Sequence, residues 1–370
     1  MNNQNGLKTI SMFSGCGGMD IGFKNAGFNI VWANDNDINA VQTYKKNIGE
    51  IEFNDIADVC LNKIPQHQIL LAGFPCQAYS NAGNRKGVND KRGRLYEYCL
   101  DAIEIHKPDA VVFENVRGLL SIKNENGDLL FEKICSILES DKFGYQVNWK
   151  LINSSDYEVP QNRIRVFVVA IKKTLNTEYI FPSPIPKNDS LKLKNILKIP
   201  KNILNQEYKD FSSDIKRLLP YIKEGGSWKN IPYDILPLRF QKIRDNMKKY
   251  RSPNFYRRFS REEINGTITA TATPENCGII HPLKNRRYTL RECARIQSFE
   301  DSFIFDYKSI SSGYRIIGNA VPPKLAFHIA CRLKELLINP ELFKNKYGMK
   351  DNYSKVNKIL TQNSQIKLNL

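Results

Sequence analysis

The stretch TISMFSGCGGMDIGF, residues 9–23, joins an apolar run, a glycine-rich turn and the start of an amphipathic segment. It predicts a strand, a tight turn and a helix in direct succession. In an open parallel sheet, ligands bind beyond the carboxyl ends of the strands, where glycines let a ligand approach the backbone. A dinucleotide site fits this loop poorly, because Asp20 stands where the third spaced glycine of that motif belongs.

Two acidic residues follow the loop at spacings that suit an adenosine-containing ligand. Asp35 lies 20 residues after Gly15, at the end of the next expected strand, where it is positioned to hold ribose hydroxyls. Asp55 could accept a hydrogen bond from the amino group of a purine ring. Each aspartate fits an ordinary helix N-cap equally well. Together with the loop, they indicate an adenosine-containing ligand without a pyrophosphate.

Short apolar runs alternate with helix-like stretches over the first 170 residues. We expect strands at residues 7–13, 28–34, 67–74, 108–116 and 163–171, and helices at residues 19–27, 37–47 and 94–107. This alternation predicts an α/β fold with a mostly parallel sheet and helices on both of its faces.

The pattern changes after about residue 175. Residues 181–285 mix prolines, aromatic residues and basic residues without clear periodicity, which indicates a smaller, irregular second domain. Over residues 286–340 the chain becomes helix-like again, with an amphipathic helix expected at residues 322–337, opened by proline. Residues 341–370 are expected to form a polar tail.

The composition is that of a soluble globular protein, with 41% hydrophobic and 25% charged residues. The sequence has no apolar run long enough to span a membrane and no secretory signal, so we expect a cytoplasmic protein. Its formal net charge is +17, and residues 171–260 hold 20 Lys and Arg against 8 Asp and Glu, which favours a polyanionic partner. The eight cysteines show no zinc-like spacing, so we expect reduced thiols and no metal site.

One cysteine stands out by its position. Cys76 directly follows Pro75 in AGFPCQAYS, residues 72–80, where an expected strand leaves regular structure. A free cysteine is most often a small buried hydrophobic residue. A cysteine on a loop at a strand end can instead be a nucleophile, if its surroundings favour the thiolate.

Six motifs occur in a familiar order: FSGCGGMDIGF at 13–23, GFPCQAYS at 73–80, FENVRG at 113–118, VPQNRIRVFVVA at 159–170, RECARIQSF at 291–299 and GNAVPP at 318–323. In these motifs the chain resembles the bacterial DNA (cytosine-5)-methyltransferases of restriction-modification systems, over roughly residues 7–170 and 265–335. The resemblance implies a Rossmann-like core dependent on S-adenosylmethionine at residues 1–180, a target-recognition domain at 181–285, and a return to the core at 286–340.

The resemblance also implies roles for the catalytic residues. Cys76 would add to carbon 6 of a cytosine flipped out of the duplex, so that carbon 5 can accept a methyl group. Glu114 would contact ring nitrogen 3 and the amino group and supply a proton. Arg163 and Arg165, which alternate along one strand face, would contact the cytosine oxygen and support the Cys76 loop.

The implied cofactor-binding residues are Phe13, Ser14, Gly15, Gly17, Gly18, Asp35, Asp55, Pro75 and Asn319. For Asn319 to reach that pocket, residues 315–335 must fold back onto the first domain. Three positions depart from the common pattern of the family: Asp35 replaces a glutamate, Asn36 a bulky residue, and Glu300 a proline. None of these departures removes a catalytic group.

We expect the recognition domain to read double-stranded DNA in the major groove. The leading candidates for contacts to base edges are Arg257, Arg258 and Thr267. A monomer is expected, and a cognate restriction endonuclease that acts on the same site without a stable complex is a further expected partner. Three alternatives stay open: a transfer-RNA cytosine-5 methyltransferase, a DNA-binding regulator without catalysis, and a dinucleotide-linked oxidoreductase.

Overall fold

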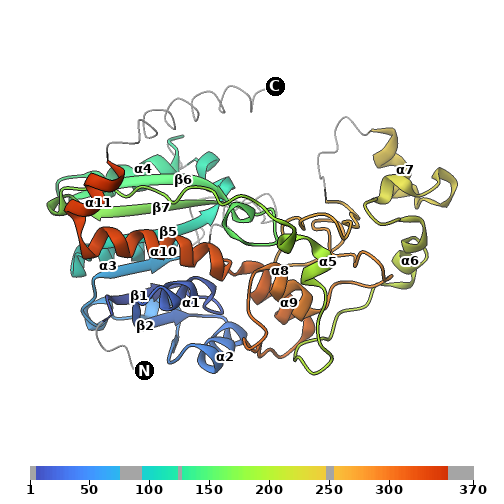
Figure 1. Ribbon diagram of the computed structural model, residues 1–370, viewed down its shortest axis with the longest axis horizontal. Helices are drawn as coiled ribbons and strands as arrows, with labels where there is room; N and C mark the ends of the chain where they lie inside the picture. The colour runs from blue at the N-terminus through green and yellow to red at the C-terminus, as the bar shows by residue number, and fades with distance from the viewer. Residues whose placement is uncertain (1–5, 76–93, 124–126, 247–253, 349–370) are drawn as a thin grey trace.

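A seven-stranded sheet organises the first half of the chain in the computed structural model, which describes residues 6–75, 94–123, 127–246 and 254–348 (Figure 1). The strand order is β3-β2-β1-β4-β5-β7-β6. The strands are β1 (Lys8–Met12), β2 (Asn29–Asp35), β3 (Glu52–Phe53), β4 (Ile69–Ala72), β5 (Ala110–Val116), β6 (Tyr145–Asn153) and β7 (Ile164–Lys172). The first five strands pair in parallel, and β7 joins both β5 and β6 in antiparallel fashion, so the predicted mostly parallel sheet is confirmed.

Helices cover both faces of the sheet and continue into the second half of the chain. The helices are α1 (Gly18–Asn25), α2 (Ile38–Asn47), α3 (Leu95–His106), α4 (Leu130–Glu139), α5 (Leu193–Ile196), α6 (Ser213–Lys216), α7 (Leu238–Asp245), α8 (Leu290–Ile296), α9 (Ile310–Asn319), α10 (Pro323–Ile338) and α11 (Pro340–Tyr347). None of the helices in the described ranges is long and apolar enough to cross a membrane.

The alternation of side chains along the strands creates two apolar layers. In β4, Leu70 and Ala72 pack with α3 and α4, whereas Ile69 and Leu71 pack with α1 and α10. Because every β4 residue is buried, this central strand reads as a continuous apolar run in the sequence. The layers confirm the predicted helices on both faces.

The sequence prediction found the five strands that surround the motifs but not β3, β6 or α4. Strand β3 has only two residues, too few to produce a pattern. Strand β6 lies at an edge of the sheet, and apolar and polar side chains alternate along its first seven residues, YQVNWKL. This alternation is typical of a half-buried strand, so the signal was present in the sequence and was missed.

Helix α10 packs against α1 on one face of the sheet (Figure 1). The Lys334 ammonium donates to the carbonyl of Ala26 at the end of α1, at 2.8 Å. The Tyr179 hydroxyl donates to the Ile329 carbonyl in α10 at 3.0 Å. The chain therefore closes one face of the sheet with a helix that begins after residue 320.

Residues 193–320 gather around a separate apolar cluster that includes Trp228, Phe240 and Phe255. Helices α8 and α9 belong to this cluster, through Leu290 and Ile317 among others. Figure 1 shows α8 and α9 between the sheet and the distant α6 and α7. The fold thus brings both halves of the chain together at the carboxyl ends of the parallel strands.

Candidate active site

A buried cluster of one carboxylate and two guanidinium groups lies at the end of β5. Glu114 is 8% exposed, and its Oε1 atom lies 3.2 Å from Nε of Arg165. Burial raises the pKa of the Glu114 carboxyl, and the positive charges of Arg165 and Arg163 partly counteract this effect. The Glu114 Oε1 atom accepts no hydrogen bond from any residue that the structure describes. A buried acceptor of this kind is available to a polar ligand.

The antiparallel pairing of β5 and β7 creates this cluster. Val116 at the end of β5 pairs with Arg165 near the start of β7. In a parallel pair, the start of the second strand would lie at the opposite end of the sheet. The antiparallel strand therefore brings both arginines to the edge where parallel α/β sheets bind their ligands.

Arg163 is 2% exposed and is held from two sides. Its Nη1 atom donates to the Ile268 carbonyl at 3.0 Å, and its backbone N–H donates to Oδ1 of Asn153 at the same distance. Because Ile268 belongs to the second half of the chain, the guanidinium bridges the two halves. The expected neighbourhood of Glu114, Arg163 and Arg165 is present in the structure.

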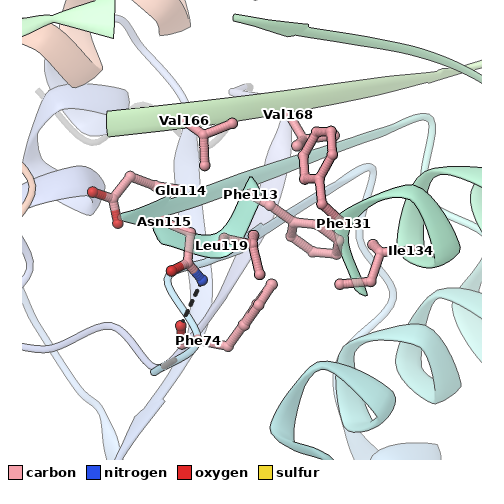
Figure 2. Close-up of a pocket in the computed structure, with 9 residues that line it drawn as sticks. All are labelled: Phe74, Phe113, Glu114, Asn115, Leu119, Phe131, Ile134, Val166 and Val168. Atoms are coloured by element: carbon pink, nitrogen blue, oxygen red, sulfur yellow. Dashed lines mark hydrogen bonds between the residues drawn. The ribbon is translucent and has the colours of Figure 1, made fainter. Parts of the chain in front are cut away.

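The strand end that leads to Cys76 is attached to the same cluster. Asn115 donates from Nδ2 to the Phe74 carbonyl at 2.9 Å (Figure 2). Pro75 follows and is exposed, whereas Cys76 lies outside the described residues. A Cβ atom built on Gly73 would lie 3.8 Å from the Phe13 carbonyl oxygen and 3.9 Å from Oε2 of Glu114. Gly73 thus lies between the glycine-rich loop and the carboxylate.

A small, mostly apolar cavity, open in part to solvent, lies beside this strand end. Figure 2 shows that its apolar side chains gather toward α4, while the Glu114 carboxylate points away from them. The lining residues are Phe74, Phe113, Glu114, Asn115, Leu119, Phe131, Ile134, Val166 and Val168. The polar side of Glu114 therefore faces the loop at Phe13 rather than this cavity.

The glycine-rich loop has the predicted strand–turn–helix geometry. Phe13 is half-buried and has a φ of 56°, in the left-handed region that non-glycine residues seldom adopt. The Ser14 N–H donates to the Asn34 carbonyl at 3.0 Å, and the Gly17 N–H donates to the Ser14 carbonyl at 3.0 Å. Strained backbone that is fixed by such contacts is typical of ligand sites.

Asp35 fixes the relative position of the loop and the end of β2. Its Oδ2 atom accepts from the Gly15 N–H and its Oδ1 atom from the Asp37 N–H, both at 2.8 Å. The N-cap of α2 is Asp37, so Asp35 is not the cap of that helix. Asp55 is exposed and does cap a turn, since its Oδ1 atom accepts from the Ala57 N–H at 3.1 Å.

A buried network beneath the loop was not predicted. The Ser14 hydroxyl donates to Oγ of Ser11 at 2.9 Å, and the Ser11 hydroxyl donates to Oδ1 of Asp20 at 2.7 Å. Asp20 is fully buried, and this burial raises its pKa to about 6. The position of Asp20 in the loop motif was visible in the sequence, but its contact with β1 required the fold.

The far end of the chain contacts the glycine-rich loop. A Cβ atom on Gly18 would lie 2.2 Å from the Val321 carbonyl oxygen, so only glycine permits this approach. Asn319 is exposed at the end of α9, two residues before Val321. These contacts bring Asn319 to the side of the loop where α1 begins.

Two of the expected base-reading residues have internal partners instead. Arg258 is 3% exposed and donates to the carbonyls of His281, Lys284 and Leu219 at 3.0 to 3.2 Å, so the expectation that it reaches bases is wrong. Arg257 pairs with Glu263 at 2.6 Å and is half-buried. Periodicity could not reveal these roles, because the carbonyls come from distant parts of the chain.

Thr267 likewise has an internal partner. Its hydroxyl donates to the Asn162 carbonyl at 2.9 Å, which ties it to the segment that carries Arg163. The residue is half-buried. It therefore lies beside the cluster of Glu114, Arg163 and Arg165.

Comparison with known proteins agrees with this geometry. The family model described as C-5 cytosine-specific DNA methylase matches residues 7–335. The Type II methyltransferase M.FnuDI of Fusobacterium nucleatum is 33% identical over 368 residues, covering 93% of this chain and 99% of the relative. The Type II methyltransferase M.NgoFVII of Neisseria gonorrhoeae is 35% identical over 363 residues, covering 94% of this chain and 90% of the relative.

Two solved structures share the fold at low sequence identity. Spodoptera frugiperda DNMT2 superposes with a TM-score of 0.63 at 18% identity, covering 90% of this chain and 99% of that one. The Entamoeba histolytica methyltransferase EhMeth has a TM-score of 0.60 at 20% identity, covering 91% of this chain and 99% of that one. With the family match over most of its length, the chain belongs to the C-5 cytosine-specific DNA methylases and is a DNA cytosine methyltransferase.

Proposed function

We propose that this enzyme transfers the methyl group of S-adenosylmethionine to carbon 5 of a cytosine flipped out of duplex DNA, through a covalent adduct with Cys76. One observation carries the assignment of roles. Glu114 has a buried oxygen that pairs with Arg165 but accepts no hydrogen bond from the described residues, and it lies near the strand end that precedes Cys76 and the glycine-rich loop.

The loop and Asp35 suit the adenosine part of this cofactor. A Cβ atom built on Gly15 would meet nothing within 4 Å, so the loop has open space above it. Asp35 supplies an anionic acceptor at the carboxyl end of β2, and its two backbone donors hold it in place. We propose that Asp35 holds the ribose and that Phe13, Ser14, Gly15, Gly17, Gly18, Asp55, Pro75 and Asn319 line the rest of the site. When bound, S-adenosylmethionine supplies a methyl group on a positively charged sulfur.

The chemical steps then follow from the residues of the chain. The Cys76 thiolate bonds to carbon 6 while ring nitrogen 3 takes a proton from Glu114, which makes carbon 5 nucleophilic enough to accept the methyl group. A solvent molecule then takes the carbon 5 proton, Cys76 departs as the thiolate, and the proton on ring nitrogen 3 returns to Glu114, which restores the aromatic ring. The raised pKa of Glu114 suits a proton donor. Once Glu114 has given up its proton, the nearby positive charge of Arg165 stabilises the carboxylate.

The charge distribution favours DNA binding by the second half of the chain. Residues 171–260 carry most of the positive excess, and we propose residues 181–285 as the recognition domain. Since Arg257 and Arg258 have internal partners, exposed cations such as Arg239 and Lys242 of α7 are better candidates for DNA contacts. The monomeric state, the cytoplasmic location and a cognate endonuclease stay predictions.

The product of the reaction tests the proposal. Duplex DNA and transfer RNA are incubated with S-adenosylmethionine that carries a deuterated methyl group, and the nucleosides are analysed by mass spectrometry. We expect deuterated 5-methyl-2′-deoxycytidine from the duplex. Label on an exocyclic amino group, or label in transfer RNA alone, would contradict the proposal.

The role of Glu114 is testable by removing its proton while keeping its shape. Glu114→Gln should reduce the single-turnover rate of methyl transfer by about 10²- to 10⁴-fold, the usual contribution of general acid–base catalysis. DNA affinity should change far less. Glu104→Gln is the matched control, because Glu104 is exposed and pairs with Lys142 on the surface. A near-normal rate for Glu114→Gln would exclude Glu114 as the essential acid.

Calorimetry of S-adenosylmethionine binding tests Asp35. Asp35→Asn keeps one oxygen acceptor but loses the charge, so affinity should fall by about 1.5–3 kcal/mol, the range for a hydrogen bond to a charged group. Asp37→Asn is the control, since Asp37 caps α2 in the same turn and pairs with Arg315. Equal losses in both variants would mean that Asp35 only maintains the shape of the turn.

A further inference from the structure

A fully buried glutamine joins three separate parts of the chain beside the catalytic cluster. Gln161 is 0% exposed and precedes Arg163 by two residues. Its Oε1 atom accepts from the Ile268 N–H at 2.8 Å. Its Nε2 atom donates to Oε1 of Gln297 at 2.8 Å and to the Ile296 carbonyl at 3.3 Å. Both ends of the amide are therefore satisfied by partners more than 100 residues away in the sequence.

The Ile268 side of this link is a short paired segment. Residues 265–268 run alongside residues 161–163, with a parallel bridge between Gln161 and Asn265. The Asn162 N–H donates to the Asn265 carbonyl at 2.8 Å, and Arg163 donates to the Ile268 carbonyl at 3.0 Å. The position of residues 265–268 therefore determines where the Arg163 guanidinium lies.

The Gln297 side of the link reaches the end of α9. Gln297 is also 0% exposed, and its Nε2 atom donates to the Ile317 carbonyl at 2.8 Å. The next residue, Gly318, packs on the backbone of Thr269, where an added Cβ atom would lie 2.4 Å from the carbonyl oxygen. These contacts close a ring, in which residues 161–163 contact 268–269, residues 268–269 contact 317–318, and Gln297 joins 317–318 back to Gln161.

The direction of the hydrogen bonds makes this ring specific. If either buried amide rotated by half a turn, a donor would face a donor or an acceptor would face an acceptor. Leaving such a group unsatisfied in the interior is costly, so the two glutamines have one favoured arrangement. The two glutamine amides are uncharged, so their hydrogen bonds do not depend on a protonation change.

We infer that Gln161 is a positioning residue that couples residues 265–269 of the second half of the chain to Arg163, and through Gln297 to the end of α9 beside the proposed cofactor site. This inference rests on the proposed function, since it assigns Arg163 to the reacting cytosine. When DNA docks on the second half, movement of residues 265–269 is transmitted to the catalytic arginine. Gln161 thus links docking to the rate of methyl transfer.

Gln161→Met tests the link, because methionine has a similar size and cannot make the three hydrogen bonds. We expect the single-turnover rate at saturating DNA and cofactor to fall by about 10- to 100-fold, in line with the loss of buried hydrogen bonds. Affinity for S-adenosylmethionine should stay within about threefold of wild type, a much smaller change than the loss of a hydrogen bond to a charged group causes. Gln297→Met, which changes the other half of the link, should lower the rate similarly.

The double variant decides between a shared link and two separate effects. If the two glutamines act together, Gln161→Met/Gln297→Met should be no slower than the slower single variant. The structural control is Asn205→Gly, which removes four hydrogen bonds to Phe305, Tyr307 and Arg291 in the second half without contacting residues 161–163. It should lower the melting temperature and leave the single-turnover rate unchanged.

Three results would overturn the inference: a normal rate for Gln161→Met, rate losses that multiply in the double variant, or an equal rate loss in Asn205→Gly. The wild-type product distinguishes this failure from failure of the proposed function. If wild-type enzyme forms 5-methyl-2′-deoxycytidine while Gln161→Met has a normal rate, only the coupling is wrong. If Gln161→Met does not fold, Gln297→Met replaces it as the test, because it leaves the bonds between residues 161–163 and 265–268 intact. A normal single-turnover rate for Gln297→Met would then overturn the inference.

Discussion

The buried Glu114 carboxyl is the constraint on which the rest of the site depends. A carboxyl in the interior is costly unless nearby charges and donors compensate for lost water. Here Arg165 lies at 3.2 Å, and Arg163 adds a second positive charge nearby. Neither arginine precedes or follows Glu114 closely in the sequence. The chain must therefore fold so that two distant segments meet at the end of β5, and the reversed direction of β7 is the feature that makes this possible.

The same requirement explains why the two halves of the chain interlock. Arg163 is buried and bonded to the Ile268 carbonyl, so the cluster of Glu114, Arg163 and Arg165 has its full set of contacts only when the second half is in place. The first half alone supplies the sheet, the glycine-rich loop and the carboxylate. The last helices return to the sheet next to the loop, at Gly18 and Val321. The proposed sites for the cofactor, the flipped base and the duplex all lie near this boundary between the two halves. Direct contacts across the boundary can therefore couple binding at one site to binding at another.

The sequence predicted those strands and turns whose residue types are restricted by their local environment. The apolar runs of β1, β2, β4, β5 and β7 and the glycine-rich turn were visible, because buried strands and tight turns restrict residue type position by position. The motifs also identified Glu114, Arg163 and Arg165 as neighbours. The burial of Arg258, the Ser11–Asp20 contact and the glutamine link were not predictable, since each depends on segments that only the tertiary fold brings together. An arginine in a basic, aromatic-rich segment looks the same whether it contacts DNA or carbonyls.

The central claim is that this cluster acts on a cytosine bonded to Cys76, and trapping that bond tests it most directly. In duplex DNA with 5-fluorocytosine at the target position, fluorine replaces the proton that must leave carbon 5, so the covalent adduct cannot resolve. The account predicts a stable protein–DNA adduct with wild-type enzyme and S-adenosylmethionine, with Cys76 identified as the attached residue by peptide mass spectrometry, and no adduct with Cys76→Ser. An adduct that persists in Cys76→Ser, or attachment at another residue, would contradict it.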